Sequence, residues 1–414
     1  MSMKYGCIGE VLKHSFSKEI HSHLAEYDYK ICEVERDKLG EFAEKKCFKA
    51  INVTIPYKEM IIPYLYYIDP MAKLIGAVNT VVNKGGRLYG YNTDFYGMKM
   101  LLAHAGVELK DKKVIILGTG GTSKTAVAVA TDCGAKEVIR ASRTAREDAI
   151  SYQQMYREHT DAEVIINTTP VGMYPNILGS PVDIDKFPSL VGVIDAVYNP
   201  LSSELVESAR ARGIAAEGGL YMLVAQAVRA SEIFIDKVYP EGELERVYKL
   251  VYNSKRNIVL TGMPASGKST VGKILARLYS RELVDTDTLI EKMTKKSIPE
   301  IFKTEGEEKF REYEREAVKE ASAKTGVIIA TGGGAVLCKE NIENLKKNGR
   351  IYFIDRPLEA LVPTDDRPLS SDKEAIKKRY EERYSIYCST ADIKIGADCD
   401  AMSVAEKIKE DFDK

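Results

Sequence analysis

Two glycine-rich loops carry the residue types and spacing that bind nucleotide phosphates. The first, Gly118-Thr119-Gly120-Gly121, directly follows the apolar run Val114–Leu117. The second extends from Gly262 to Thr270 in the pattern GxxxxGK[ST] and follows Ile258–Leu260. Each pattern predicts a buried strand, a tight turn and a helix whose free N–H groups face a phosphate. Two nucleotide sites of different design indicate two catalytic units in one chain.

The second loop predicts a site for ATP and Mg²⁺. In loops of this pattern the backbone N–H groups wrap the phosphates, the lysine reaches the outer phosphates and the following hydroxyl ligates the metal. Lys268 and Ser269 occupy these two positions, and the backbone of the loop is contributed by Gly262, Ala265, Ser266, Gly267, Ser269 and Thr270. The loop alone does not identify the group that accepts the phosphate.

The first loop predicts a dinucleotide site built on Gly118, Gly120 and Gly121, with Ser123 where a third glycine is common. After the next predicted strand, Glu137–Ile139, an acidic residue would hold the ribose of NAD. This chain instead has Ser142, Arg143, Thr144 and Arg146 there. Because guanidinium groups suit a 2′-phosphate, the segment predicts NADP(H). An ordinary basic surface is the alternative.

Composition limits the classes of protein that this chain can be. Its 414 residues are enough for two or three domains, and 44% of them are hydrophobic. The net charge of −1 offers no electrostatic reason to bind nucleic acid or an anionic membrane. The seven cysteines form no CxxC pair, which favours reduced thiols, and no apolar run is long enough to cross a bilayer. We therefore expect a soluble, cytoplasmic protein.

The predicted elements position the two loops in an α/β fold. A strand at Ile51–Thr54 and a hairpin around Asn83–Gly86 precede the first loop and indicate a substrate domain. We expect a first unit over 1–253, with a substrate domain (1–97 plus 226–253) and a Rossmann-like NADP domain (98–225). A P-loop kinase domain with a parallel sheet should occupy 254–414, after a short polar junction at Tyr252–Arg256. The charge-rich stretch Glu291–Lys324 is typical of solvated helix faces.

Several short segments between about residues 4 and 250 resemble the shikimate dehydrogenase family, and they occur in the family's order. They are His14–Ser17, Asn52–Lys58, Gly76–Thr80, Asn92–Asp94, Asn167–Met173, Asp195–Pro200 and Gly218–Gln226. The resemblance implies that Lys58 and Asp94 form the catalytic pair. It implies that the substrate is held by Ser15, Ser17, Thr54, Asn79, Tyr198 and Gln226, and that Gly219 contributes to the cofactor site. Lys18, Phe95 and Ser142 depart from residues frequent in that family.

Residues from about 256 to 400 resemble shikimate kinases. The matching segments are the phosphate loop, Asp285-Thr286-Asp287, Phe310–Glu314, Thr331–Val336, Asp366–Leu369 and the segment around Arg383. The resemblance implies that Asp287 contacts the attacking hydroxyl, Asp285 supports Mg²⁺ and Arg367 acts from a lid. It also implies that the shikimate carboxylate is bound by Arg311 and Arg383, next to the backbone of Gly332, Gly333 and Gly334. Glu314 is expected to orient Arg311, and the lid lacks an additional arginine common in the family.

Together the two resemblances imply consecutive steps of aromatic amino acid biosynthesis. NADPH would reduce 3-dehydroshikimate to shikimate, and ATP would then phosphorylate shikimate to shikimate 3-phosphate. Three alternatives stay open at this stage: quinate or another hydroxy acid as the dehydrogenase substrate, a different small-metabolite kinase, and a regulator that binds these ligands without turnover. The expected partners are these small molecules, without nucleic acid or membrane, and a homo-oligomer is possible.

Overall fold

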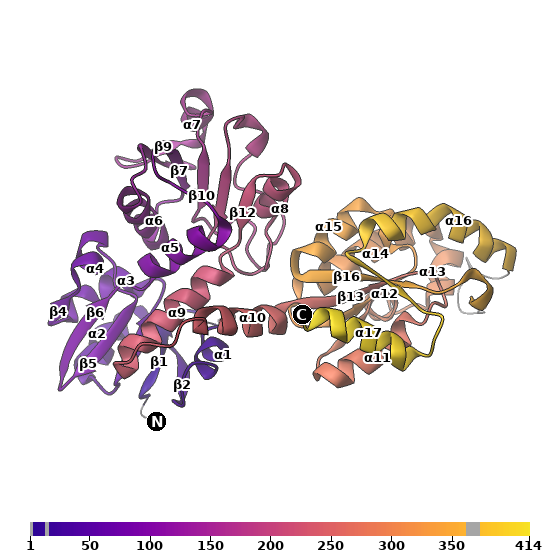
Figure 1. Cartoon of the computed structure of the whole chain (residues 1–414), viewed down its shortest axis with the longest axis horizontal. Coiled ribbons are helices and arrows are strands. Elements are labelled where there is room, and N and C mark those ends of the chain that lie inside the picture. Colours follow the sequence, from indigo (N-terminus) through magenta and orange to yellow (C-terminus); the bar gives the residue numbers. More distant parts are fainter. Residues whose placement is uncertain (1–2, 13–15, 362–372) are drawn as a thin grey trace. The chain divides into compact units, whose positions relative to one another are not determined.

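The structure is a computed structural model of the chain, and it describes residues 3–12, 16–361 and 373–414. The chain divides into two compact units, Met1–Val251 and Tyr252–Lys414. Figure 1 labels the elements of both. The boundary falls inside helix α10 (Glu243–Lys255). The polar stretch expected as a junction is therefore the last turn of a helix, anchored by buried Val247 and Val251 four residues apart.

The first sheet of the first unit has the strand order β2-β1-β3-β5-β6-β4. Strands β5 and β6 form the predicted hairpin, with Lys84 opposite Arg87 and with Gly85 and Gly86 both at positive φ in the turn. Buried Ile8, Ile51 and Val81 contribute to its core. The strands are β1 (Tyr5–Gly9), β2 (Tyr29–Glu33), β3 (Ala50–Val53), β4 (Tyr67–Ile68), β5 (Thr80–Lys84) and β6 (Arg87–Tyr91).

The second sheet is parallel, with the order β12-β11-β10-β7-β8-β9. This is the order of dinucleotide-binding sheets, in which the ligand lies at the carboxyl ends where the strand order reverses. That point lies between β7 and β10, directly beyond the first glycine loop. The strands are β7 (Lys113–Leu117), β8 (Glu137–Ser142), β9 (Ile150–Ser151), β10 (Val164–Asn167), β11 (Gly192–Asp195) and β12 (Ala215–Glu217).

Helices α5 (Asp94–Ala105) and α9 (Leu220–Ile235) pack against each other and connect the two sheets of this unit (Figure 1). Met222 of α9 packs in the core of the second sheet, whereas Ala230 and Phe234 pack against the first. The other helices are α1 (Ser17–Ser22), α2 (Leu39–Lys45), α3 (Tyr57–Met60), α4 (Pro70–Ile75), α6 (Gly121–Asp132), α7 (Tyr152–Glu158) and α8 (Glu204–Ala211), with 3-10 turns η1 (Arg36–Lys38), η2 (Ile62–Tyr64) and η3 (Ile184–Lys186).

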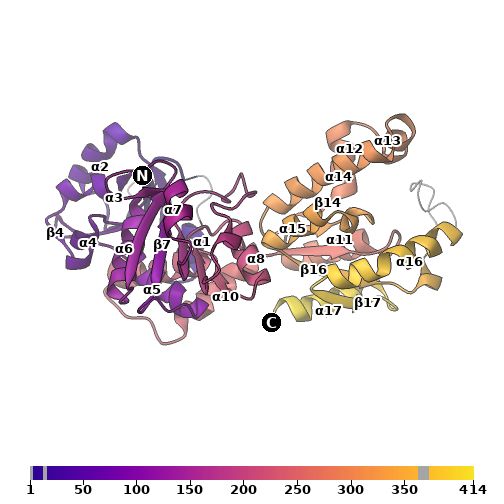
Figure 2. The same ribbon diagram turned by 90° about the horizontal axis from the view of Figure 1, so that it is seen from above.

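The second unit is a parallel sheet with the order β14-β15-β13-β16-β17 and helices on both faces (Figure 2). Ile258 and Leu260 of β13 face α11 and α17, whereas Val259 faces α14 and α15, because side chains alternate along a strand. Its strands are β13 (Asn257–Thr261), β14 (Leu283–Asp285), β15 (Ile328–Ala330), β16 (Gly349–Asp355) and β17 (Ile393–Gly396).

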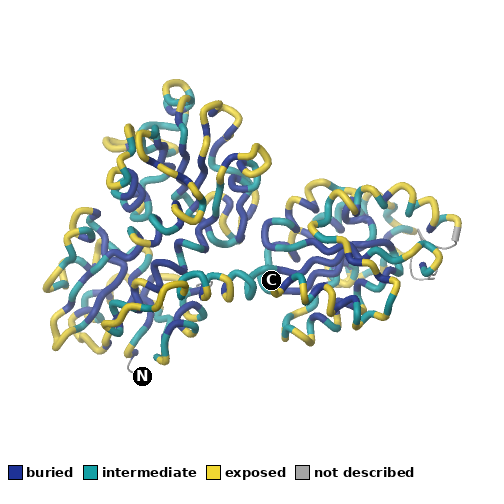
Figure 3. The backbone as a smooth tube through the Cα atoms, viewed as in Figure 1, coloured by how far each residue is buried: buried dark blue, intermediate teal, exposed yellow. Residues whose placement is uncertain are grey.

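The helices of this unit include the charge-rich stretch, which forms α12 (Thr286–Thr294), α13 (Ile298–Thr304) and α14 (Gly306–Ala323). The others are α11 (Lys268–Tyr279), α15 (Lys339–Asn348), α16 (Lys373–Thr390) and α17 (Ala401–Phe412), with 3-10 turns η4 (Ala335–Leu337) and η5 (Leu358–Ala360). Central strands of the sheets are buried (Figure 3). The predicted fold class is confirmed: an α/β substrate domain and a Rossmann-like domain, followed by a P-loop kinase domain with a parallel sheet.

Candidate active sites

Lys58 and Asp94 form an ion pair at the carboxyl edge of the first sheet. Lys58 lies on α3, which follows β3, and Asp94 is the first residue of α5. Lys58 Nζ and Asp94 Oδ2 are 2.6 Å apart, and the two side chains are only 16% and 10% exposed. The N-terminus of a helix favours a carboxylate, and burial at this depth requires a partner for each charge. The structure thus brings the predicted pair together.

A buried polar network connects two further predicted residues next to Asp94. Asn79 Oδ1 accepts a hydrogen bond from the Thr93 backbone N–H at 2.7 Å, and Asn79 Nδ2 donates to Thr93 Oγ1 at 3.0 Å. The Thr93 hydroxyl also lies 3.4 Å from Gln226 Oε1. Thr93 was not predicted as a site residue, although it precedes Asp94 in the Asn-Thr-Asp segment. It joins Asn79 and Gln226 into one polar wall.

Tyr198 approaches the first sheet from the second. It follows β11, and its ring packs edge-on against Phe16 with 5.2 Å between centroids. Burial raises the pKa of Tyr198. Ser17 is the residue after Phe16 and begins α1, and Thr54 directly follows β3. The predicted residues Ser17, Thr54 and Tyr198 therefore come from three segments at the ends of the two sheets. Ser15 lies outside the described residues.

Asp195 explains how the turn that carries Tyr198 is held. This carboxylate is fully buried at the end of β11 and accepts hydrogen bonds from Asn167 Nδ2 (2.8 Å), the Val197 N–H (3.0 Å) and Ser203 Oγ (2.5 Å). Burial raises the pKa of Asp195 to about 6, and the three hydrogen bonds oppose that rise. Asp195 lies in a segment that resembles the family, but it was not predicted as a site residue. It fixes the backbone three residues before Tyr198.

The first glycine loop leaves room for a pyrophosphate. Gly118 has φ +110°, and a Cβ there would lie 2.7 Å from Thr168 Oγ1, so only glycine fits. A Cβ on Gly120 would meet no atom within 4 Å, and one on Gly121 would meet only Lys58 Cδ at 3.9 Å. Gly120 caps α6 without a side-chain hydrogen bond. The open helix N-terminus fits a dinucleotide phosphate and lies beside the Lys58–Asp94 pair.

Arg143 and Arg146 are exposed after β8, and the described residues give neither of them a carboxylate partner. Arg140 differs, because it pairs with Asp148 and donates to Ser123 Oγ at 3.1 Å. Ser142 Oγ donates to the Thr144 carbonyl, which shapes the turn. Two available guanidinium groups at this strand end fit the 2′-phosphate of NADP(H).

Gly219 serves close packing. It caps α9, and a Cβ there would lie 2.3 Å from the Ala196 carbonyl oxygen. No side chain larger than hydrogen can be accommodated without moving that backbone. What the structure shows of Gly219 is therefore its contact with the strand end that leads to Tyr198, while its predicted contact with the cofactor stays a prediction.

In the second unit the phosphate loop lines a cavity of about 240 Å³. It is lined by Ala265, Gly267, Lys268, Ser269, Thr270, Asp285, Asp287, Thr331 and Gly333. Lys268 Nζ is nearly buried and donates to the carbonyls of Gly262 and Met263, each at 2.9 Å. Two predicted residues, Gly262 and Ser266, are not among its lining residues. A Cβ on Gly262 would lie 2.8 Å from the Ile354 carbonyl oxygen, so Gly262 permits the loop to pass β16.

Ser269 and Asp285 provide oxygen ligands suited to Mg²⁺. Ser269 Oγ donates to Asp285 Oδ2 at 2.7 Å, while Asp285 Oδ1 caps α12 by accepting from the N–H groups of Asp287 and Thr288. Within the described parts of the chain, no cluster of three or more His, Cys, Asp or Glu could hold a metal ion. Mg²⁺ commonly takes one or two protein oxygens and completes its shell with water and phosphate, so these two residues fit it.

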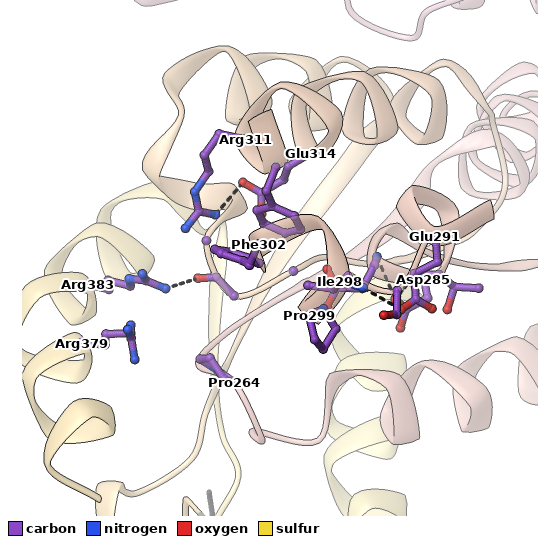
Figure 4. A pocket seen from close by; sticks show the side chains of 17 residues that line it. Pro264, Asp285, Glu291, Ile298, Pro299, Phe302, Arg311, Glu314, Arg379 and Arg383 are labelled. Atoms are coloured by element: carbon purple, nitrogen blue, oxygen red, sulfur yellow. Dashed lines mark hydrogen bonds and ion pairs between the residues drawn. The ribbon is translucent and has the colours of Figure 1, made fainter. Parts of the chain in front are cut away.

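A second cavity, of about 420 Å³, lies against the first (Figure 4). Its lining includes the predicted residues Asp287, Arg311, Arg383, Gly332, Gly333 and Gly334. A Cβ on Gly332 would lie 2.6 Å from Asp287 Oδ1, and one on Gly334 would lie 2.0 Å from Arg311 Nη1. Gly332 and Gly334 thus make room for a carboxylate and a guanidinium. Asp285, Asp287 and Gly333 line both cavities, so Asp287 stands between them.

Arg311 is held by two carboxylates. Its Nη1 lies 2.9 Å from Glu314 Oε2 and its Nη2 lies 2.9 Å from Glu307 Oε1. Glu314 is 1% exposed, and burial raises its pKa although Arg311 opposes that rise. The expected pair between Glu314 and Arg311 therefore forms, and it is buried. Arg383 instead donates to the Gly333 carbonyl at 3.1 Å.

Arg379 also lines the larger cavity and was not predicted. It lies four residues before Arg383 on α16, a spacing that places two side chains on one helix face.

Arg367 and most of the expected lid lie outside the described residues. Among the residues that are described, no helix is both long and apolar enough to span a membrane.

The chain matches two described families. "Shikimate dehydrogenase substrate binding domain" matches residues 7–81, and "Shikimate kinase" matches residues 264–413. The NADP(+)-dependent shikimate dehydrogenase of Clostridium beijerinckii is 38% identical over 245 residues, which cover 56% of this chain and 91% of that protein. The Clostridium perfringens enzyme is 38% identical over 264 residues and covers 59% of this chain and 97% of its own length.

Solved structures of shikimate dehydrogenases are also similar to this chain. Shikimate dehydrogenase 1 from Peptoclostridium difficile is 35% identical with a TM-score of 0.56, over 61% of this chain and 98% of its own. The Thermus thermophilus shikimate 5-dehydrogenase, solved with NADP(H) and shikimate, is 26% identical with a TM-score of 0.55, over 60% of this chain and 99% of its own. The chain therefore belongs to the shikimate dehydrogenase family through its first unit and carries a shikimate kinase domain as its second.

Proposed function

We propose that this chain catalyses two consecutive reactions: NADPH-dependent reduction of 3-dehydroshikimate to shikimate, and ATP-dependent phosphorylation of shikimate to shikimate 3-phosphate. One observation carries the proposal. A single chain holds a buried Lys58–Asp94 pair beside a dinucleotide loop and, in its other unit, an Asp287 between a nucleotide cavity and a second cavity. The hydroxyl made by the first reaction is the nucleophile of the second.

In the first reaction Lys58 provides the proton. When bound, the nicotinamide cofactor supplies the hydride. Lys58 Nζ, held 2.6 Å from Asp94 Oδ2, is placed to donate a proton to the ketone oxygen and to stabilise the negative charge that develops there. Asp94 accepts from Lys58 and so orients it. Asn79 and Gln226, joined through Thr93, offer hydrogen bonds to the ring hydroxyls of the substrate. Tyr198 bounds the substrate site on the side that faces the second sheet.

In the second reaction Asp287 accepts a hydrogen bond from the attacking hydroxyl. Lys268, at the base of the nucleotide cavity, can release the loop carbonyls that it now contacts and stabilise charge on the transferring phosphoryl group. Ser269 and Asp285 would hold Mg²⁺, which neutralises phosphate charge when bound. Arg311 and Arg383 suit the acceptor carboxylate because guanidinium binds carboxylate bidentately.

The test uses the whole purified chain with 3-dehydroshikimate, NADPH, ATP and Mg²⁺. NADPH loss should precede ADP release. Lys58→Ala should lower only the reductase rate and Asp287→Asn only the kinase rate, each by about 10²–10⁴-fold, as expected for a positioned acid or base. Each variant controls the folding of the other. Loss of both activities in one variant would contradict the assignment.

Three finer expectations belong to the same proposal: preference for shikimate over quinate, location in the cytoplasm, and assembly as a homo-oligomer. A steady-state comparison of shikimate and quinate oxidation tests the first. Fluorescent fusion of the whole chain in its host tests the second, and light scattering of the purified protein tests the third. A higher kcat/KM for quinate would replace the proposed substrate of the first unit.

A further inference from the structure

The larger cavity of the second unit contains a third guanidinium group. Arg379 lines it together with Arg311 and Arg383. Figure 4 shows Arg379 and Arg383 side by side on α16, at the end of the cavity away from Asp285. The inference below rests on the proposed kinase function and adds a residue to it.

The charges around the three arginines are compensated unequally. Arg311 is paired with Glu314 and Glu307, each at 2.9 Å. Arg383 donates to a neutral carbonyl, that of Gly333. Among the described residues, Arg379 Nη1 is buried and has no hydrogen-bond partner. In the part of the chain that the structure describes, neither arginine of α16 forms an ion pair, although Glu307 and Glu382 act on the charge of Arg379 and Arg383 acts on that of Glu314.

The unpaired Nη1 is costly, although the Arg379 side chain as a whole is only partly buried. A buried donor without an acceptor loses its hydration and receives nothing in return. Burial and the nearby charge of Arg383 both lower the pKa of Arg379, whereas Glu307 and Glu382 oppose that effect. An anion between Arg379 and Arg383 would remove both the missing hydrogen bond and the repulsion.

The cavity is also polarised along its length. Carboxylates of Asp285 and Asp287 stand at the wall shared with the nucleotide cavity, and the two guanidinium groups of α16 stand at the far end (Figure 4). A small acid whose carboxylate and reacting hydroxyl lie at opposite ends can bind in only one direction. Its carboxylate would face α16 and its hydroxyl would face Asp287.

We propose that Arg379 is a specificity-determining residue that binds the carboxylate of the acceptor together with Arg383. The spacing of four residues on α16 places the two guanidinium groups on one face, so that both reach one carboxylate. Arg311, which lies against Gly334 and is held by two carboxylates, remains the third guanidinium group of this carboxylate site.

The experiment compares Arg379→Gln with the unchanged chain. KM for shikimate should rise by about 10- to 100-fold, as expected for loss of a charge-assisted hydrogen bond, while KM for ATP and kcat stay within about threefold. Arg379→Lys should show an intermediate KM, because an ammonium keeps the charge but not the planar fork. Lys378→Gln, an exposed charge on the same helix, is the matched control and should leave both KM values unchanged.

A second acceptor separates binding from folding. With the methyl ester of shikimate, which lacks the negative charge, Arg379→Gln and the unchanged chain should have equal KM values. An equal loss with acid and ester would mean that Arg379 is structural, and an unchanged KM for the acid would mean that it does not touch the carboxylate. Either result overturns the proposal.

Calorimetric binding of shikimate to both proteins keeps this outcome apart from the proposed function. Absence of ADP release from the unchanged chain would refute the kinase activity. Equal shikimate affinity in the two proteins, with turnover intact, would refute only the role of Arg379.

Discussion

At the scale of single residues, buried ionisable groups dominate the chemistry of this chain. Lys58, Asp94, Lys268 and Glu314 are all largely buried, and each has a partner within hydrogen-bond distance. Charged groups are stable at such depth only when they are paired. Removing one partner leaves the other charge buried and unpaired. The effect of a single substitution on activity or stability therefore reports on both residues of the pair.

His21 is a buried ionisable group of a different kind. Its ring is fully buried and stacks on Tyr29 with 3.9 Å between centroids, and its Nδ1 lies 2.6 Å from the Tyr27 hydroxyl. Burial lowers the pKa of His21 from 6.5 to about 3, while a hydrogen bond to Asn52 opposes the change. His21 is therefore neutral in the folded protein at any pH in which the enzyme would work.

We predict that His21 makes the first unit less stable as the pH falls. Between pH 6.5 and 3 the unfolded histidine binds a proton that the folded one does not, so its contribution to the free energy of unfolding drops by about 2 kcal/mol at pH 5. Asp195 has the opposite effect. Its pKa is raised to about 6, so its contribution to the free energy of unfolding falls as the pH rises toward 6. The His21 contribution must therefore be obtained as a difference between two proteins.

Urea unfolding of the native chain and of His21→Phe measures this difference, followed by circular dichroism because the chain has no tryptophan. The phenylalanine keeps a stacked ring, and Tyr27 keeps its bond to Ser231 Oγ at 2.7 Å. The stability difference between the two proteins should shift by about 2 kcal/mol from pH 7 to pH 5 in favour of the variant. A difference that does not vary with pH would contradict the prediction.

At the scale of elements, glycines at strand ends serve two separate purposes. Gly219 lets α9 approach the end of β11, since a Cβ there would lie 2.3 Å from the Ala196 carbonyl oxygen. Gly120 leaves space at the N-terminus of α6, where a Cβ would meet nothing within 4 Å. Gly219 is needed for packing, and we propose that Gly120 is needed for a ligand.

These purposes predict different results for two similar substitutions. Gly219→Ala should destabilise the first unit by about 2 kcal/mol, because overpacking against backbone forces a shift. Gly120→Ala should change stability by less than about 1 kcal/mol yet raise KM for NADPH, since its methyl group occupies the space in front of the helix. Thermal unfolding and reductase kinetics check both. Equal destabilisation by the two substitutions would show that the loop, too, is packed rather than open.

The same elements show what sequence could and could not predict. The hairpin of β5 and β6, the phosphate loop and the Lys58–Asp94 pair were predictable, because each depends on turn chemistry or on a short motif. Arg379 was not, since α16 has charged residues around its circumference and its periodicity does not mark which of them is buried. Thr93 acts through Asn79 and Gln226, and Asp195 in part through Asn167, partners that only the fold brings close. The junction at Tyr252–Arg256 coincides with the boundary between the two units, but its polar residues did not reveal that it is the last turn of a helix.

At the scale of the whole molecule, each unit has its own sheets and its own cores. The clusters that fill the sheets of the first unit consist of residues from Met1–Val251, and those that fill the sheet of the second consist of residues from Tyr252–Lys414. We expect the two units to respond to their ligands separately. A ligand at 100 times its Kd stabilises the unit that binds it by about 2.7 kcal/mol.

Hydrogen exchange with mass spectrometry tests this expectation in the full chain. NADP⁺ should slow exchange only in peptides from Met1–Val251, and ADP with Mg²⁺ only in peptides from Tyr252–Lys414. Lys268→Met should remove the second effect and leave the first. Protection that extends from one unit into the other would show that the units are energetically coupled.

The wall formed by Asp285, Asp287 and Gly333 has a consequence for inhibitor chemistry. Because it belongs to both cavities, one compound could carry a carboxylated ring at one end and a polyphosphate at the other and fill both at once. Joining two weak fragments makes the second contact intramolecular, which can raise affinity by about 10²–10⁴-fold without any new interaction. Such a bisubstrate compound would inhibit the kinase and leave the reductase running, so shikimate would accumulate.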